Sequence, residues 1–252
     1  MGQRTSSFRQ RLIQGDALMG TFLKTPSSIM AEVLALSDLD VIAIDAEHHP
    51  FGRLETDACI AALRSADMPS LVRLSSDSPT DIRNALDCGA TGIVVPHVTT
   101  AEQAAAIVKA AHFGDGGRGY AGSTRAAGYG TKPMAEHLRD SAEQTVVIVQ
   151  IEDIAALDNV AAISAVSGVN CLFVGRVDLA VGMQKTVMDS DVIATVQQTC
   201  AAGKSDDTAV GMFTPDLAEL PDWQDRGASL FLLSSEHSLA LAGANKLAQA
   251  IR

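Results

Sequence analysis

The sequence predicts an α/β fold, a single (β/α)8 barrel, and three observations lead to this prediction. Eight short apolar segments alternate with segments of helical pattern along the 252 residues. Each apolar segment is a continuous run, which is typical of parallel strands covered on both faces. A chain of about 250 residues with eight such repeats has the usual size of this barrel. A doubly wound open sheet has the same periodicity and remains the alternative, although no GxGxxG motif follows the first strand.

The apolar runs are the predicted strands, because each is short and bounded by turn-forming residues. They cover residues 17–23, 41–45, 68–74, 91–96, 146–151, 170–175, 209–213 and 230–233. No stretch of linker composition separates them. We therefore expect residues 1–252 to form one domain.

Helix signals lie between the strands. Ser27 or Ser28 can cap a helix that runs to about Leu36, and Ile29, Val33 and Leu36 give this helix an apolar face. The remaining helices are predicted over residues 52–66, 79–89, 100–111, 134–142, up to about 165, 191–202, from 215, and 237–251, after a polar and helical N-terminal arm.

A glycine-rich loop at residues 114–130 interrupts the alternation of strands and helices. Loops of this length are commonly functional or disordered. Its Arg118 and Arg125 could bind a phosphate, but the loop lacks the GKS or GKT ending of a P-loop.

The composition excludes several partners. The chain has 19 basic and 30 acidic residues and a formal net charge of −11, which repels nucleic acid and anionic membranes. No apolar run is long enough for a transmembrane helix, and residues 1–18 lack the apolar core of a secretory signal. The 4 cysteines are widely spaced, form no CxxC motif and fit reduced thiols, so we expect a cytoplasmic protein.

Polar side chains follow most of the predicted strands. They are Lys24, Asp45, Glu47, His48, Arg73, His97, Gln150, Glu152, Asp178 and Ser234. The carboxyl ends of barrel strands meet at one rim, where enzymes of this fold place their catalytic groups. We therefore expect these side chains to converge on one candidate active site.

Three of these groups have both a chemical and a structural interpretation. Glu152 and Asp178 follow neighbouring strands and could hold a divalent cation such as Mg²⁺, or they could be ordinary solvated acids. His48 is a candidate general base, because a neutral imidazole can take a proton near neutral pH. Either His48 or the adjacent His49 could instead serve only structure.

The cations at the strand ends are also open to two interpretations. Arg73 could bind a carboxylate or stabilise a developing oxyanion, or it could form a salt bridge with Asp45. Lys24 could act as a Schiff-base amine, or it could be a surface lysine at the start of a loop.

Four short motifs occur in order between about Gly20 and Met183. They are Asp45-x-Glu47-His48-x-Pro50, Val72-Arg73, Gln150-Ile151-Glu152 and Gly175-x-x-Asp178-Leu179. In order and spacing this set resembles the HpcH/HpaI family of class II, metal-dependent pyruvate aldolases. The resemblance implies the same (β/α)8 barrel for the whole chain.

The resemblance also implies roles for individual residues. Glu152 and Asp178 would hold a divalent metal (Mg²⁺, Mn²⁺ or Co²⁺), which a 2-oxo acid would chelate through its carboxylate and keto oxygens. His48 would be the catalytic base, and Arg73 would contact the substrate and stabilise the charge of the transition state. Glu47 is not an expected metal ligand.

The remaining implied residues support this centre. Gln150 and Val177, together with Asp178, would contact the substrate. Asp45 would belong to the network of the base, and Asp87, from the same or a neighbouring subunit, would raise the basicity of the histidine. Arg176 and Val177 depart from the family, in which proline and a small residue are common at these positions.

The implied function is reversible cleavage of a 4-hydroxy-2-oxo acid to pyruvate or hydroxypyruvate and an aldehyde, through an enolate that the metal and Arg73 stabilise. The implied assembly is a homo-oligomer, often a hexamer, in which the last helix packs on a neighbour. Three alternatives remain. They are a C–C bond-forming synthase or CoA-ester lyase on the same barrel, a Schiff-base aldolase that uses Lys24, and a non-catalytic barrel that binds metabolites.

Overall fold

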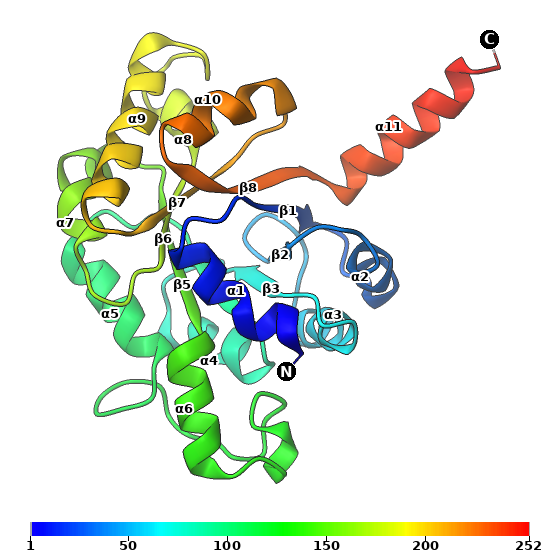
Figure 1. Ribbon diagram of the computed structural model, residues 1–252, viewed down its shortest axis with the longest axis vertical. Coiled ribbons are helices and arrows are strands. Elements are labelled where there is room, and N and C mark those ends of the chain that lie inside the picture. Colours follow the sequence, from blue (N-terminus) through cyan, green and yellow to red (C-terminus); the bar gives the residue numbers. More distant parts are fainter. Residues whose placement is uncertain (1, 252) are drawn as a thin grey trace.

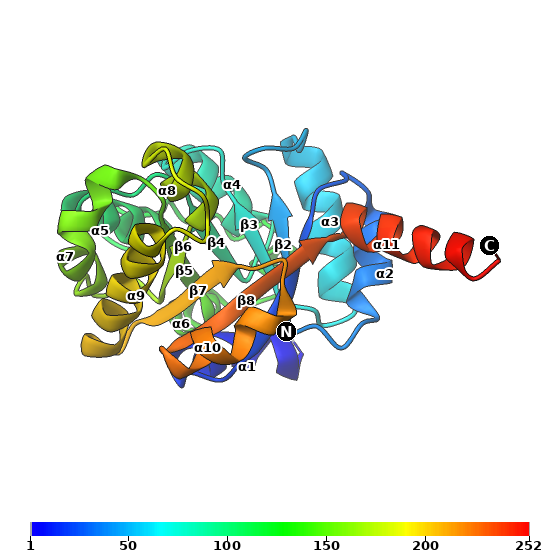
Figure 2. The same ribbon diagram turned by 90° about the horizontal axis from the view of Figure 1, so that it is seen from above.

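Eight parallel strands close into a barrel at the centre of the molecule (Figures 1 and 2). The structure is a computed structural model and describes residues 2–251. The strands are β1 (Leu18–Leu23), β2 (Val41–Asp45), β3 (Ser70–Arg73), β4 (Gly92–Val95), β5 (Val146–Ile151), β6 (Cys171–Val174), β7 (Ala209–Phe213) and β8 (Ala228–Ser235). They follow chain order around the barrel, and β8 pairs with β1. The predicted barrel is confirmed, and this closing pair excludes the open sheet.

Helices surround the barrel, and most of them cover its outer face (Figure 1). They are α1 (Gln3–Ile13), α2 (Ser28–Ala35), α3 (Arg53–Ser65), α4 (Pro79–Asp87), α5 (Ala101–Ala111), α6 (Met134–Gln144), α7 (Val160–Ser164), α8 (Arg176–Gly182), α9 (Ser190–Ser205), α10 (Leu220–Asp225) and α11 (Glu236–Gln249). Three short 3-10 turns are η1 (Gly128–Gly130), η2 (Ile154–Asn159) and η3 (Leu217–Glu219). The segment predicted as one helix up to residue 165 is η2 followed by α7, and α8 was not predicted.

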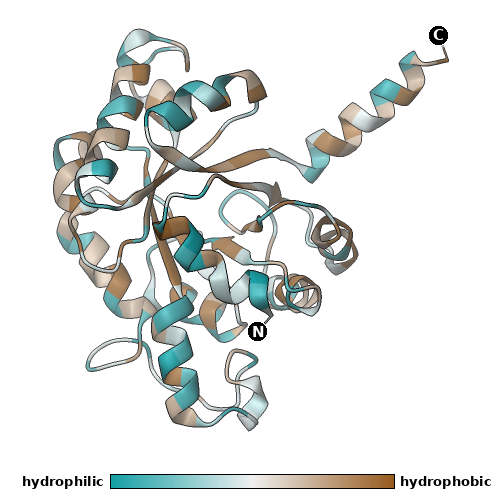
Figure 3. Cartoon of the chain, viewed as in Figure 1, coloured by the Kyte–Doolittle hydropathy of each residue, from teal (hydrophilic) through white to brown (hydrophobic). Residues whose placement is uncertain are grey.

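The second strand shows why the strands are continuously apolar. Val41 and Ala43 belong to the cluster inside the barrel, whereas Ile42 and Ile44 pack in the layer between the barrel and its helices. Successive strand residues point to opposite faces, and both faces are buried here. Figure 3 shows apolar strands at the centre of the molecule.

The N-terminal helix closes one end of the barrel. Phe8 and Leu12 of α1 are fully buried and belong to the same cluster as Leu18 and Ile148, which line the barrel interior. Leu18 is the first residue of β1, so α1 lies at the amino ends of the strands. The opposite rim, at the carboxyl ends, is left for the polar side chains.

The predicted cap at Ser27 is confirmed, and Thr100 caps α5 in the same way. The Ser27 hydroxyl accepts a hydrogen bond from the Met30 N–H at 3.3 Å, and the Thr100 hydroxyl accepts one from the Gln103 N–H at 3.1 Å. Each cap satisfies a backbone donor that the first turn of a helix leaves unpaired.

The apolar face predicted for α2 does not pack on the barrel. Ile29, Val33 and Leu36 are exposed, and Leu36 is 84% exposed, while Ala31 and Leu34 face the core. An apolar stripe therefore remains uncovered within the single chain.

The glycine-rich loop is folded back on its own chain. Arg118 forms an ion pair with Asp87, and Arg125 forms one with Asp57. Arg118 also lies over the ring of Phe113, 4.5 Å from its centroid. Since carboxylates already bind both guanidinium groups, neither arginine is available to bind a phosphate in this arrangement.

The last helix projects away from the body of the molecule (Figures 1 and 2). After its first residue, Glu236, every described residue of α11 is exposed, including the apolar Leu239, Leu241 and Leu247. Among residues 2–251, no helix is both long enough and apolar enough to span a membrane.

Candidate active site

A cavity of about 290 Å³ opens at the carboxyl ends of the strands. It is lined by Phe22, Lys24, His48, Arg73, Gln150, Phe173, Val174, Gly175, Arg176, Val177, Asp178 and Phe213. These residues come from β1, β3, β5, β6 and β7 and from the segments that follow β1, β2 and β6. The barrel thus brings six of the predicted site residues to one cavity. They are His48, Arg73, Gln150, Val177, Asp178 and Lys24.

Asp45 is the buried centre of a hydrogen-bond network beside this cavity. Its carboxylate is fully buried and accepts two hydrogen bonds from Arg73, from Nε at 3.0 Å and from Nη2 at 2.7 Å. It also lies 2.8 Å from His49 Nδ1 and 3.3 Å from the His48 backbone nitrogen, whose N–H it accepts. Burial alone would raise the pKa of Asp45, but the hydrogen bonds and charge of Arg73 hold this pKa below its ordinary value.

The two adjacent histidines have different surroundings. The His48 side chain is 58% exposed, lines the cavity and places Nε2 3.7 Å from Glu47 Oε2. His49 instead contacts Asp45, and its ring meets the His237 ring edge-on at a centroid distance of 6.0 Å. Of the two imidazoles, His48 is therefore the one that can reach a molecule in the cavity.

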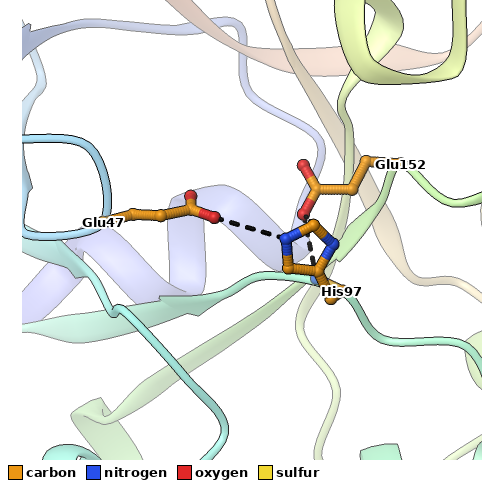
Figure 4. A group of neighbouring side chains, drawn as sticks. All are labelled: Glu47, His97 and Glu152. Atoms are coloured by element: carbon orange, nitrogen blue, oxygen red, sulfur yellow. Dashed lines mark hydrogen bonds and ion pairs between the residues drawn. The ribbon is translucent and has the colours of Figure 1, made fainter. Parts of the chain in front are cut away.

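A cluster of two carboxylates and an imidazole borders the cavity (Figure 4). Potential ligand atoms of Glu47, His97 and Glu152 all lie within 4.8 Å of one another. His97 has a left-handed backbone with φ of 55°, and its N–H donates to Glu152 Oε1 at 2.9 Å. The Asp153 carboxylate lies 3.0 Å from His97 Nδ1.

Electrostatics in this cluster favour a bound cation. Burial raises the pKa of Glu152, and the neighbouring charges of Glu47 and Asp178 raise it further. Glu47 Oε2 is buried and accepts no hydrogen bond from the described residues, although it forms an ion pair with Arg73, whose Nε lies 3.3 Å away. Oxygen-rich, negatively charged groups with an unsatisfied oxygen suit a divalent metal, because a cation would relieve both their repulsion and their desolvation. The residues present therefore fit the metal that the sequence implied.

Asp178 is not a member of this cluster. It is exposed in the first turn of α8, near enough to Glu152 to affect its pKa. A Cβ added to Gly175 would lie 2.5 Å from the Glu152 Cβ, so only glycine allows α8 to start this close to Glu152. Gln150 donates a side-chain hydrogen bond to Glu152 and helps to orient it.

Arg176 lines the cavity, but its guanidinium is already bound by another residue of the chain. Its guanidinium donates to the Glu219 carboxylate at 2.5 Å and 3.3 Å, and Trp223 Nε1 donates to the same carboxylate at 3.0 Å. Its neighbour Val177 is half exposed at the cavity wall.

Asp87 is not part of this site within the chain. It ends α4 and pairs with Arg118 of the glycine-rich loop. A catalytic role for Asp87 would therefore require a neighbouring subunit to bring it to His48.

Several residues of the site were missed from the sequence. Phe22, Phe173 and Phe213 form an apolar wall, with the Phe22 and Phe213 rings 6.0 Å apart. Their inward position within each strand was the available signal, but in a buried strand an aromatic residue is indistinguishable from ordinary core. Glu47 and His97 were noted at strand ends and were not assigned to the metal, although the geometry brings both beside Glu152.

Comparisons with known proteins agree with this architecture. A family model described as HpcH/HpaI aldolase/citrate lyase matches residues 18–241. A hydroxypyruvate/pyruvate aldolase of Paraburkholderia phytofirmans is 32% identical over 261 aligned residues, which cover 100% of both chains. A 4-hydroxy-2-oxovalerate aldolase of Rhodococcus jostii is 34% identical over 85% of this chain and 84% of that protein.

The similarity extends to three dimensions. The crystal structure of an HpcH/HpaI aldolase/citrate lyase family protein from Burkholderia cenocepacia superposes with a TM-score of 0.92. The two sequences are 34% identical, and the match covers 98% of this chain and 100% of that chain.

Proposed function

The chain belongs to the HpcH/HpaI aldolase/citrate lyase family and is a carbon–carbon lyase, and we propose that it is a divalent-metal-dependent aldolase of 4-hydroxy-2-oxo acids. Its products would be pyruvate or hydroxypyruvate and an aldehyde. One observation carries the proposal. An accessible imidazole and an arginine fixed by a buried carboxylate line a small cavity that the Glu152 cluster borders.

His48 is the proton acceptor in this proposal. In the cleavage direction its imidazole takes the proton of the 4-hydroxyl group, and the C3–C4 bond breaks to release the aldehyde. The electron pair of that bond passes into the enolate of the 2-oxo acid. Return of a proton to C3 then yields pyruvate or hydroxypyruvate.

Arg73 stabilises the negative charge that develops on the 2-oxo acid. Asp45 binds its guanidinium through two hydrogen bonds, so the cation is oriented before the reaction begins. A preorganised charge of this kind needs little rearrangement when the enolate forms.

Glu152 is common to two sets of possible metal ligands. One set adds Asp178, as the resemblance implies, and the other adds Glu47 and His97, which lie beside Glu152. When bound, a divalent cation would act as a Lewis acid on the keto group. The chain's own contribution is to hold the carboxylates close together and partly buried.

Removal of the metal tests the proposal. We expect treatment with EDTA and desalting to abolish cleavage of 4-hydroxy-2-oxo acids, and Mg²⁺, Mn²⁺ or Co²⁺ to restore it. By calorimetry, Glu152→Gln should bind Mn²⁺ at least about tenfold more weakly than the wild type. Comparison of Asp178→Asn with His97→Asn then decides between the two ligand sets. Full activity after exhaustive chelation would refute the metal-dependent mechanism.

A Schiff-base aldolase is the second candidate, because Lys24 lines the cavity. Reduction with borohydride in the presence of pyruvate separates the two mechanisms. We expect no mass increase at Lys24, whereas a trapped adduct would favour the Schiff base.

The family description also includes citrate lyases, so a lyase acting on CoA esters is a further candidate. Assays of pyruvate with aldehydes and of CoA esters, run side by side, distinguish it. Turnover with the CoA ester alone would replace the aldolase proposal.

A further inference from the structure

We propose that Lys24 binds an anionic group, a carboxylate or a phosphate ester, on the aldehyde partner of the reaction. This inference rests on the proposed aldolase function and names the class of its second substrate. It also assigns a role to a cation that the mechanism leaves unused.

The charges of the cavity single out Lys24. The lining residues include one lysine and two arginines, Lys24, Arg73 and Arg176. Arg73 is paired with Asp45, and Arg176 is paired with Glu219. Among residues 2–251, the Lys24 ammonium forms no ion pair and no hydrogen bond. It is therefore the cation of this wall that is available to a ligand.

The position of Lys24 is fixed by its backbone. The Lys24 N–H donates to both carboxylate oxygens of Glu236, at 2.8 Å and 3.0 Å, and the Thr25 N–H donates to the same carboxylate at 2.5 Å. The Glu236 residue is 3% exposed. Since this buried carboxylate binds the backbone and forms no ion pair with the ammonium, it anchors the base of the side chain and leaves the ammonium able to contact a ligand.

The apolar wall of the cavity strengthens the preference of Lys24 for an anionic ligand. Phe22, Phe173 and Phe213 are apolar neighbours in the same cavity. A cation beside apolar walls is screened less than one in open water, so it attracts an anion more strongly. A neutral aldehyde could accept a hydrogen bond from this ammonium group but would lack the attraction between opposite charges.

The barrel topology separates Lys24 from the proposed place of the 2-oxo acid. Lys24 follows β1 and Glu152 follows β5, and these strands lie opposite each other in the closed ring of eight. In the proposed function the keto group of the 2-oxo acid belongs at the divalent cation that Glu152 would hold. An anion held by Lys24 therefore belongs to the other end of the hydroxy-oxo acid, the part released as the aldehyde.

The test compares matched aldehydes with pyruvate as the donor. One pair is succinic semialdehyde and butanal, and the other is glyceraldehyde 3-phosphate and glyceraldehyde. In the wild type we expect the higher kcat/KM for the anionic member of at least one pair, and the pair that responds distinguishes a carboxylate from a phosphate. In Lys24→Met the ratio of anionic to neutral kcat/KM should fall about 10- to 100-fold, the usual effect of losing a charged hydrogen bond.

Two controls accompany this variant. Lys24→Arg should restore most of the ratio, because it restores the cation. Lys185→Met removes an equal charge at a lysine that is paired with Asp189 outside the cavity, and it should leave the ratio unchanged.

Three outcomes would overturn the inference. They are equal use of anionic and neutral aldehydes by the wild type, an unchanged ratio in Lys24→Met, and a rise in the KM of pyruvate with every aldehyde, which would place the donor at Lys24. Absence of any aldol product in the wild type would instead overturn the proposed function itself, and this inference with it.

Discussion

His48 and His49 are adjacent in the sequence, but only one of them reaches the cavity. His48 is exposed beside Glu47, whereas His49 is bound to the fully buried Asp45. The network of Asp45 explains the difference, because this carboxylate accepts the His48 backbone N–H and also lies 2.8 Å from the His49 ring. It therefore fixes the backbone under one imidazole and the ring of the other.

These two histidines form a matched pair for mutation. His48→Ala should lower kcat about 10²- to 10⁴-fold, because it removes the proposed proton acceptor. His49→Ala should lower kcat about tenfold or less, because it removes one of several contacts to Asp45. His49→Asn should recover part of this loss, since its amide can reach Asp45 in place of Nδ1. Steady-state kinetics with circular dichroism checks the prediction, and equal losses in both alanine variants would contradict it.

At this scale the sequence could predict which residues reach the rim but not what each one touches. The buried strands ending in Asp45, Arg73 and Glu152 indicated an active site, since barrel strands share one rim. The pairing of Arg73 with Asp45 and the closeness of Glu47 to Glu152 depend on side-chain directions across neighbouring strands. No spacing in a single chain contains that information.

Elements were predictable where their pattern was long or strongly periodic. All eight strands were found because their apolar runs are buried on both faces. α8 was missed because it has seven residues, starts with Arg176 and buries only part of its length. Its position depends on tertiary contacts, above all the binding of Arg176 by Glu219 and Trp223 near α10.

The hydrogen bonds of Arg176 in α8 and Trp223 in α10 to the Glu219 carboxylate make the free energy of unfolding depend on pH. The hydrogen bond from Arg176 lowers the pKa of Glu219, which burial alone would raise, and the Trp223 hydrogen bond lowers it further. A carboxyl whose pKa is lower in the folded state stabilises above its unfolded pKa and loses that contribution as pH falls through its folded pKa. Glu219→Gln should therefore cost about 1–2 kcal/mol at neutral pH.

Urea unfolding at a series of pH values measures this difference. The difference in free energy of unfolding between the wild type and Glu219→Gln should be constant near neutral pH. It should shrink below about pH 4, where glutamate takes up a proton. Glu136→Gln, at a partly exposed acid in the first turn of α6, serves as the control. A gap that widens in acid would contradict the assigned role of Arg176.

At the scale of the whole molecule, two apolar surfaces remain uncovered in the single chain. One is the outer stripe of α2, and the other includes Leu239 and Leu247, which share one side of the projecting α11. Exposed apolar stripes of this kind usually mark contacts between proteins. The packing of the last helix on a neighbour, which the family resemblance implied, would cover α11.

We predict that the α2 stripe receives α11 of another subunit in a homo-oligomer. Leu239→Glu with Leu247→Glu, and separately Ile29→Glu with Val33→Glu, should each lower the mass measured by light scattering, because each buries charges against an apolar partner. Met188→Glu replaces a side chain of similar exposure away from both stripes and should leave the mass unchanged.

The pattern of results locates the contact. Loss of assembly in both double variants supports α11 on α2, since the two surfaces would then be halves of one interface. Loss in the α11 variant alone would move the contact to another surface of the neighbour. A wild-type chain that stays at 26.3 kDa at micromolar concentration would contradict the oligomer altogether. It would also leave Asp87 without a route to His48, because within one chain Asp87 is held by Arg118.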